Sequence, residues 1–156
     1  MFRLAEPADS EQIAELVVQL TTEICTLTNE HLFDINLAET TKQCLELITE
    51  GNYNAMIVFD GIRPIAVATI SETFALYAKG KIGVIQEFYV CPDYRSSGVG
   101  SQLIEQVKNY GMKQNWSRME LCTPPLPEFE ASLRFYQKNG LEIVGGRKMR
   151  QSLVEG

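Results

Sequence analysis

The spacing of the apolar residues changes along the chain, and these changes predict where its helices and strands lie. Ile13, Leu16 and Leu20 recur at the three- and four-residue spacing of a helix with one buried face. Short apolar runs, such as 54–59 and 65–71, are typical of strands, and Asp60 with Gly61 between them is a hairpin turn signal. The sequence therefore predicts an ordered mixture of helices and strands.

Taken in order, the patterns predict eleven helices and strands. They are strand 2–6, helix 10–24, a helix from Asn36 to Gly51, strands 54–59, 65–71 and 81–90, helix 101–113, strand 118–122, helix 129–138, and strands 141–144 and 148–153. This β-α-α-β-β-β-α-β-α-β-β order predicts an α/β fold in which a mixed sheet has helices on both faces. Strands 81–90 and 118–122 should run parallel, and residues 1–156 are expected to form a single domain.

Composition and charge exclude several classes of function. The net charge of −6 argues against a nucleic-acid surface, which needs a basic patch. No apolar run approaches the ~20 residues of a membrane helix, so no membrane partner is expected. The four cysteines form no C-x-x-C pair and the chain has one histidine, so no metal site is expected. Reduced thiols in a cytoplasmic protein are the favoured interpretation.

The segment 95–100, with the sequence R-S-S-G-V-G, follows a predicted strand and precedes a predicted helix. The first amides of a helix have no intrahelical partner and attract anions. Gly98 and Gly100 let the backbone approach a ligand closely, and Arg95 adds a cation. Leu103 excludes the G-x-G-x-x-G dinucleotide pattern, and Gly100-Ser101-Gln102 excludes the Walker ending. The segment therefore predicts a phosphate site of another kind.

The pattern R-x-x-G-x-G after V-x-P (Val90-Cys91-Pro92) resembles the acetyl-CoA pyrophosphate loop of the general amine N-acetyltransferases, the GNAT superfamily. The flanking segments 86–95 and 135–141 resemble its fourth strand and its late helix with the following turn. The resemblance implies a GNAT-type acyl-CoA N-acyltransferase fold. It also implies transfer of an acetyl group from acetyl-CoA, as cosubstrate, to a primary amine of a small molecule by direct attack.

The resemblance also implies a set of cofactor-binding residues. Phe88 and Val90 would offer main-chain contacts to pantetheine, with Tyr89 between them. The pyrophosphate would be surrounded by Arg95, Ser96, Ser97, Gly98, Val99, Gly100 and Ser101. Many members carry a cofactor-contacting asparagine where this chain has Phe129, and Ser132 is the candidate substitute.

Two residues are candidates for catalysis. Tyr136 matches the family's late-helix tyrosine, which donates a proton to the departing thiolate, although it could instead pack in the core. Glu87 is the only acid in its apolar strand, and burial of a carboxyl group raises its pKa toward neutrality, which suits a general base. Glu87 could act directly or through water, or be a solvated or ion-paired strand residue, and Glu72 and Glu120 are the alternative candidates for the base. Tyr89 shares the face of Glu87 and would then also line the acceptor site.

The acceptor is expected to contact segments 25–36, 72–80 and 123–128. Glu23, Glu30, His31 and Asp34 could bind a cationic amine or simply face solvent. Two other functions stay open, namely a protein lysine or N-terminal acetyltransferase and a non-catalytic acetyl-CoA-binding regulatory module. A homodimer is also left open.

Overall fold

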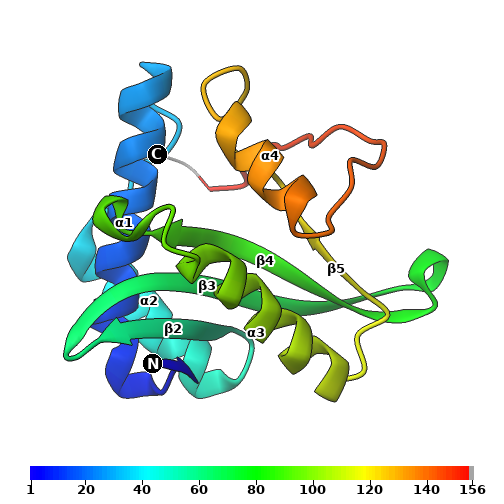
Figure 1. The fold of residues 1–156 in the computed structure, drawn as a ribbon, viewed down its shortest axis with the longest axis horizontal. Coiled ribbons are helices and arrows are strands. Elements are labelled where there is room, and N and C mark those ends of the chain that lie inside the picture. Colours follow the sequence, from blue (N-terminus) through cyan, green and yellow to red (C-terminus); the bar gives the residue numbers. More distant parts are fainter. Residues whose placement is uncertain (155–156) are drawn as a thin grey trace.

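The computed structural model of the protein describes residues 1–154, which contain one five-stranded sheet in the order β1-β2-β3-β4-β5 (Figure 1). Its strands are β1 (Phe2–Leu4), β2 (Asn54–Asp60), β3 (Arg63–Ala75), β4 (Gly80–Val90) and β5 (Arg118–Leu121). Its helices are α1 (Ser10–Thr28), α2 (Leu37–Glu50), α3 (Val99–Lys113) and α4 (Glu130–Lys138). The order of these elements confirms the prediction as far as α4.

Strands β1 to β4 are antiparallel neighbours, whereas β5 runs parallel to β4. Gly61, in the turn between β2 and β3, has a φ of 62°, the left-handed conformation that favours glycine. Beyond the predicted bounds, β3 and β4 continue pairing as far as Ala75 and Gly80, so segment 72–80 belongs to a long hairpin. The mixed sheet follows the prediction, since α3 connects two parallel strands as a crossover helix.

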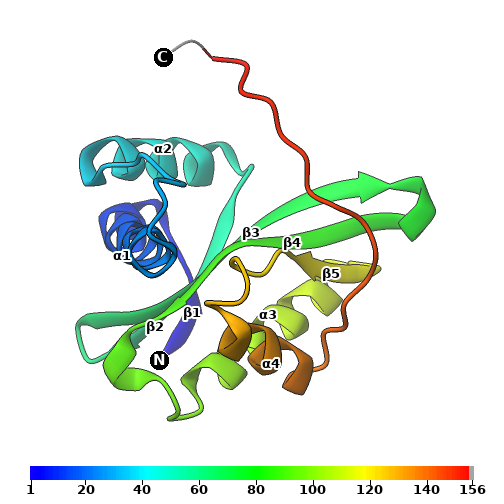
Figure 2. The same ribbon diagram turned by 90° about the horizontal axis from the view of Figure 1, so that it is seen from above.

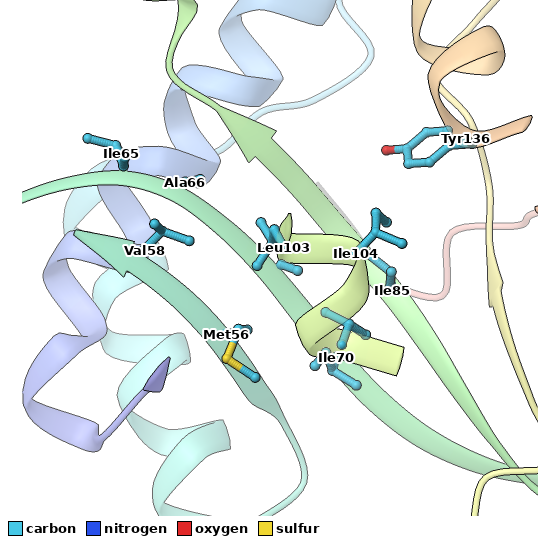
Figure 3. Packing of buried hydrophobic residues seen from close by; sticks show 11 residues of the cluster. Met56, Val58, Ile65, Ala66, Ile70, Ile85, Leu103, Ile104 and Tyr136 are labelled. Carbon is cyan, nitrogen blue, oxygen red and sulfur yellow. The ribbon is translucent and has the colours of Figure 1, made fainter. Parts of the chain in front are cut away.

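Helices cover both faces of the sheet, with α1 and α2 on one side and α3 and α4 on the other (Figure 2). The first side buries a cluster that includes Ile13, Leu16 and Ile57. The second side buries Met56, Ile85, Leu103, Ile104 and other apolar residues (Figure 3). Each side chain of this size contributes about 1.5–3 kcal/mol when fully buried. Two apolar layers therefore hold β3 and β4, the strands that carry the candidate site, from both sides.

Trp116 packs where α3 meets β4, between two glycines. A Cβ at Gly83 would lie 2.2 Å from the indole, and one at Gly111 would lie 2.3 Å from it. The indole N–H donates a hydrogen bond to Glu72, with a nitrogen–oxygen distance of 2.6 Å. Neither glycine has room for a methyl group, so this pair sets the distance between helix and sheet. Trp116 is thus a structural residue.

We expect Gly111→Ala to lower the free energy of unfolding, although alanine favours helices. Overpacking costs about 1–3 kcal/mol, and the gain in helix propensity offsets at most about 1 kcal/mol of it. Thermal or urea unfolding would measure the difference. In a Trp116→Ala background the clash is absent, so the same substitution should become neutral or stabilising there. Equal destabilisation in both backgrounds would contradict this account of the packing.

The two strands predicted at 141–144 and 148–153 are absent, which corrects the sequence-based prediction. The structure has neither helix nor strand from Leu141 to Val154. This segment runs from the α4 side of the sheet toward the α2 side and pairs with no strand (Figure 2). Met149 and Leu153 are 92% and 91% exposed. A strand needs a hydrogen-bonded neighbour, and the apolar alternation here is left without one.

Candidate active site

The carboxyl half of β4 has a free edge, because β5 diverges from it. β5 pairs only with residues 82–85 of β4, whereas β3 pairs with β4 up to Val90. The register against β3 passes from Ile85 to Glu87, so Gln86 forms a β-bulge. Because of the bulge, the side chains that follow it point to the opposite face of the sheet from the one that strict alternation would give. As a result, Ile85 packs in the α3 cluster, whereas Tyr89 packs in the cluster of α1 and α2.

The hydrogen bonds of β4 fix which backbone groups face this free edge. The amides of Glu87 and Cys91 point toward β3, where they donate to the Thr69 hydroxyl (2.9 Å) and the Ile65 carbonyl (2.8 Å). Because backbone groups alternate along a strand, those of Phe88 and Val90 point the opposite way. The Val90 carbonyl accepts a hydrogen bond of 2.9 Å from the Arg95 guanidinium. The backbone amide and carbonyl of Phe88 and the amide of Val90 therefore lie at the free edge of β4.

The glycine loop leads from β4 into the first turn of α3. Gly98 is the N-cap residue, with a φ of 89° that an L side chain rarely adopts. A Cβ at Gly100 would lie 3.0 Å from the Phe135 ring, so a glycine here lets α3 and α4 approach closely. The Gln102 amide donates to the Gly98 carbonyl as the first bond of the helix. The amides before it, 99–101, have no carbonyl within the helix to bond.

Arg95 is already engaged by protein groups. Besides the Val90 carbonyl, its guanidinium pairs with Glu23 at 3.0 Å and lies over the Tyr89 ring. The Ser97 hydroxyl donates to the Tyr94 carbonyl. These contacts make Arg95 a brace between β4, α1 and the loop. Any phosphate at this loop would therefore be held mainly by helix amides, with Arg95 as a neighbouring charge.

A cavity of about 710 Å³, which we call the loop cavity, lies beside this free edge. It brings together most of the residues predicted to bind a cofactor: Phe88, Tyr89, Val90, Arg95, Ser96, Gly98, Gly100, Ser101 and Ser132. Ser97 and Val99 are not among its lining residues. Tyr89 lines this cavity and not the other one described below, so it lies on the cofactor side of the site.

Glu87 belongs to a compact hydrogen-bond cluster on the α1–α2 face of the sheet. Its Oε1 accepts hydrogen bonds from the Tyr53 hydroxyl and from the Thr69 hydroxyl, the latter at 2.8 Å. Burial and the nearby carboxylate both raise the pKa of Tyr53, so its phenol stays protonated and donates. Glu87 Oε2 has no hydrogen bond to any residue in 1–154, and this leaves one carboxylate oxygen available to a ligand.

Sequence patterns did not reveal Tyr53 and Thr69 as parts of this cluster. Tyr53 lies 34 residues before Glu87 in the chain and one residue before β2 begins. Thr69 is fully buried in β3 and stands opposite Glu87. The only local signal in the sequence is the hydroxyl of Thr69 within an apolar strand, because a buried hydroxyl requires a hydrogen-bond partner.

Tyr136 lies on α4 and is buried, with 7% of its surface exposed. Its ring packs edge-on against Phe88 and Phe135, and its hydroxyl points from α4 toward β4 (Figure 3). Burial raises the pKa of Tyr136, so its hydroxyl keeps the proton that it could donate. Tyr136 thus packs in the core and also lines a cavity, and its role as proton donor stays a prediction.

A second cavity of about 630 Å³, the α1–α2 cavity, lies between these helices and the sheet. Tyr53, Thr69 and Glu87 line it, together with residues 120–125. It shares four lining residues with the loop cavity: Leu20, Phe88, Pro124 and Tyr136. Residues 72–80 line neither cavity, contrary to the expectation that they contact the acceptor. The two cavities therefore adjoin at Phe88 and Tyr136.

The described residues also bear on metal binding, membrane crossing and thiol chemistry. Within residues 1–154, no three His, Cys, Asp or Glu side chains gather closely enough to hold a metal ion. None of the helices in that range combines the length and apolarity needed to cross a bilayer. All four cysteines are free thiols, and burial raises the pKa of Cys91 beside the loop, which disfavours its reactive thiolate.

Comparison with known proteins defines the family. The model of the acetyltransferase (GNAT) family matches residues 18–141, so the chain belongs to this family of acyltransferases. An uncharacterized N-acetyltransferase of Archaeoglobus fulgidus is 33% identical over 55 residues, which is 35% of this chain and 37% of that protein. The match thus spans little more than a third of this relative's length.

Solved structures show the same fold. An integron cassette protein from the mobile metagenome of Cole Harbour Salt Marsh superposes with a TM-score of 0.80 and 17% identity, over 99% of this chain and 91% of that one. An aminoglycoside acetyltransferase from an uncultured soil metagenomic sample superposes with a TM-score of 0.77 and 11% identity, over 99% and 96% of the two chains. The GNAT fold implied by the sequence is thus confirmed.

Proposed function

We propose that the protein is an N-acetyltransferase that transfers the acetyl group of acetyl-CoA to a primary amine of a small molecule by direct attack. The observation that carries this proposal is the meeting of two cavities at Phe88 and Tyr136. One cavity contains a loop suited to phosphate, and the other contains a carboxylate suited to an amine. Family membership supports acyl transfer in general.

Acetyl-CoA fits the loop cavity by its chemistry. The amides 99–101 at the start of α3 offer donors and the positive helix end to a pyrophosphate. The Phe88 backbone and the Val90 amide, at the free edge of β4, offer hydrogen bonds to the amide groups of pantetheine, as an added strand would. A thioester held this way would lie beside Phe88, next to the α1–α2 cavity.

The reaction requires two proton movements, and the chain has a candidate for each. An ammonium group bound at Glu87 gives a proton to that carboxylate, directly or through water, and becomes a neutral nucleophile. Its nitrogen then bonds to the thioester carbon. As the carbon–sulfur bond breaks, the Tyr136 hydroxyl gives its proton to the thiolate, and the proton leaving the new amide nitrogen restores the tyrosine by way of solvent. The products are an N-acetyl amine and CoA, and Glu87 becomes a carboxylate again by releasing the proton of the ammonium group to solvent.

Release of CoA from acetyl-CoA, measured across a panel of primary amines, tests this function. Glu87→Gln should lower kcat by roughly 100-fold at pH 7, at the lower end of the range for general acid–base catalysis. The loss should shrink toward pH 9, because solution base then deprotonates more of the amine. A non-catalytic binding module would release no CoA with any amine. Unchanged kcat in Glu87→Gln would remove Glu87 from the mechanism.

A further inference from the structure

We propose that the acceptor is a primary amine carried on an uncharged alkyl or aryl body, bound with its amino group at Glu87 and its carbon body against α1, α2 and the connecting segment. This proposal rests on the N-acetyltransferase function proposed above. It names the class of amine, which neither family membership nor the resemblance supplies.

Apolar side chains make up most of the wall of the α1–α2 cavity. They come from α1, from the segment between the two helices, and from α2: Ile13, Val17, Leu20, Ile24, Leu32, Phe33, Ile35 and Leu47. Phe33 and Ile35 stay 41% and 40% exposed, although they line a cavity. An apolar ligand would remove this surface from water, and each buried methylene strengthens binding about 4-fold.

Charged side chains are few in the same wall, namely Glu87, Glu120 and Lys148. Glu120 pairs with Arg118 at 3.0 Å, so Glu87 is the acid without a cationic partner. The acidic residues Glu30 and Asp34 of the connecting segment and its one histidine, His31, are exposed and absent from the wall. A second ammonium group on the acceptor would therefore meet carbon, where an unpaired charge is costly.

The Glu87 cluster explains how the amino group would be oriented. Tyr53 and Thr69 both bind Oε1, which holds the carboxylate in one orientation and leaves Oε2 to receive a ligand. One charged group at one end of an otherwise apolar cavity selects a ligand with a single cationic end. Tyr53 and Thr69 are positioning residues in this arrangement.

A matched pair of amines tests the proposal. Hexylamine and 1,5-diaminopentane have the same number of non-hydrogen atoms, but the second replaces a terminal methyl with a charged group. We expect kcat/KM for acetylation of hexylamine to exceed that for diaminopentane by at least about 50-fold, and from butylamine to hexylamine it should rise several-fold per methylene. Thermal shifts with each amine in the presence of CoA report binding without turnover.

A matched pair of variants tests the location of the carbon body. Phe33→Ala should lower kcat/KM for hexylamine by about 10-fold and for butylamine by much less, with the thermal shift by acetyl-CoA unchanged. Phe74→Ala makes the same change in the long hairpin, where Phe74 is exposed and lines neither cavity. This variant should leave kcat/KM for hexylamine and for butylamine unchanged.

Each outcome has a definite meaning. Preference for hexylamine that Phe33→Ala reduces supports the proposal. Preference for diaminopentane or for an aminoglycoside overturns the apolar acceptor and leaves the N-acetyltransferase function intact. Absence of acetylation with every amine overturns the proposed function itself. In that case, a thermal shift with hexylamine and none with diaminopentane would still support an apolar amine site, and the reverse would overturn it.

Discussion

Tyr136→Phe should lower kcat by about 100- to 1000-fold and change the affinity for acetyl-CoA by less than about 3-fold. The substitution removes only the hydroxyl, because the ring packs against Phe88 and Phe135 and phenylalanine keeps those contacts. Without that proton, the thiolate must leave as an anion or take a proton from water. Steady-state release of CoA gives kcat, and titration of the protein with acetyl-CoA gives the affinity.

Tyr110→Phe is the control for loss of a tyrosine hydroxyl. The Tyr110 hydroxyl accepts a hydrogen bond of 3.1 Å from Asn54, and the residue lines neither cavity. This variant should keep wild-type kcat. If Tyr136→Phe also keeps it, Tyr136 is a packing residue and the proton for the thiolate comes from elsewhere.

Gly98→Val should abolish the stabilisation that acetyl-CoA gives to the folded protein. A ligand at 100 times its Kd stabilises the native state by about 2.7 kcal/mol, which raises Tm by about 5–10 °C for a chain of this size. Valine is strained at a φ of 89°, so the loop must move and the amides of the first turn of α3 move with it. Thermal unfolding with and without acetyl-CoA measures the loss.

Gly61→Val provides a control with the same kind of strain elsewhere. Gly61 has a φ of 62°, and a Cβ there would contact nothing within 4 Å, as at Gly98. Its substitution should lower Tm and leave the rise with acetyl-CoA intact. A full rise in Gly98→Val would place the pyrophosphate away from this loop. Gly100→Val, which presses on Phe135, should give the same loss as Gly98→Val.

Local sequence patterns predicted the order of elements up to α4, since helix and strand spacing depends on neighbouring residues. They also located the glycine loop, because Gly98 and Gly100 mark backbone conformations and close approaches that other residues resist. The same patterns predicted two final strands that do not form. The alternation at 148–153 is suitable for a strand, but no neighbouring strand accepts its hydrogen bonds.

The sequence by itself determined the fold class and the position of the glycine loop, and it supplied the candidates Glu87 and Tyr136, since each is carried by residues close together in the chain. Only the tertiary structure decided what surrounds them. It joined Tyr53 and Thr69 to Glu87 across 34 and 18 residues, formed the bulge at Gln86, and brought two cavities together at Tyr136. The physical reason is that strand register and side-chain packing between distant segments set these contacts, and no local spacing encodes them.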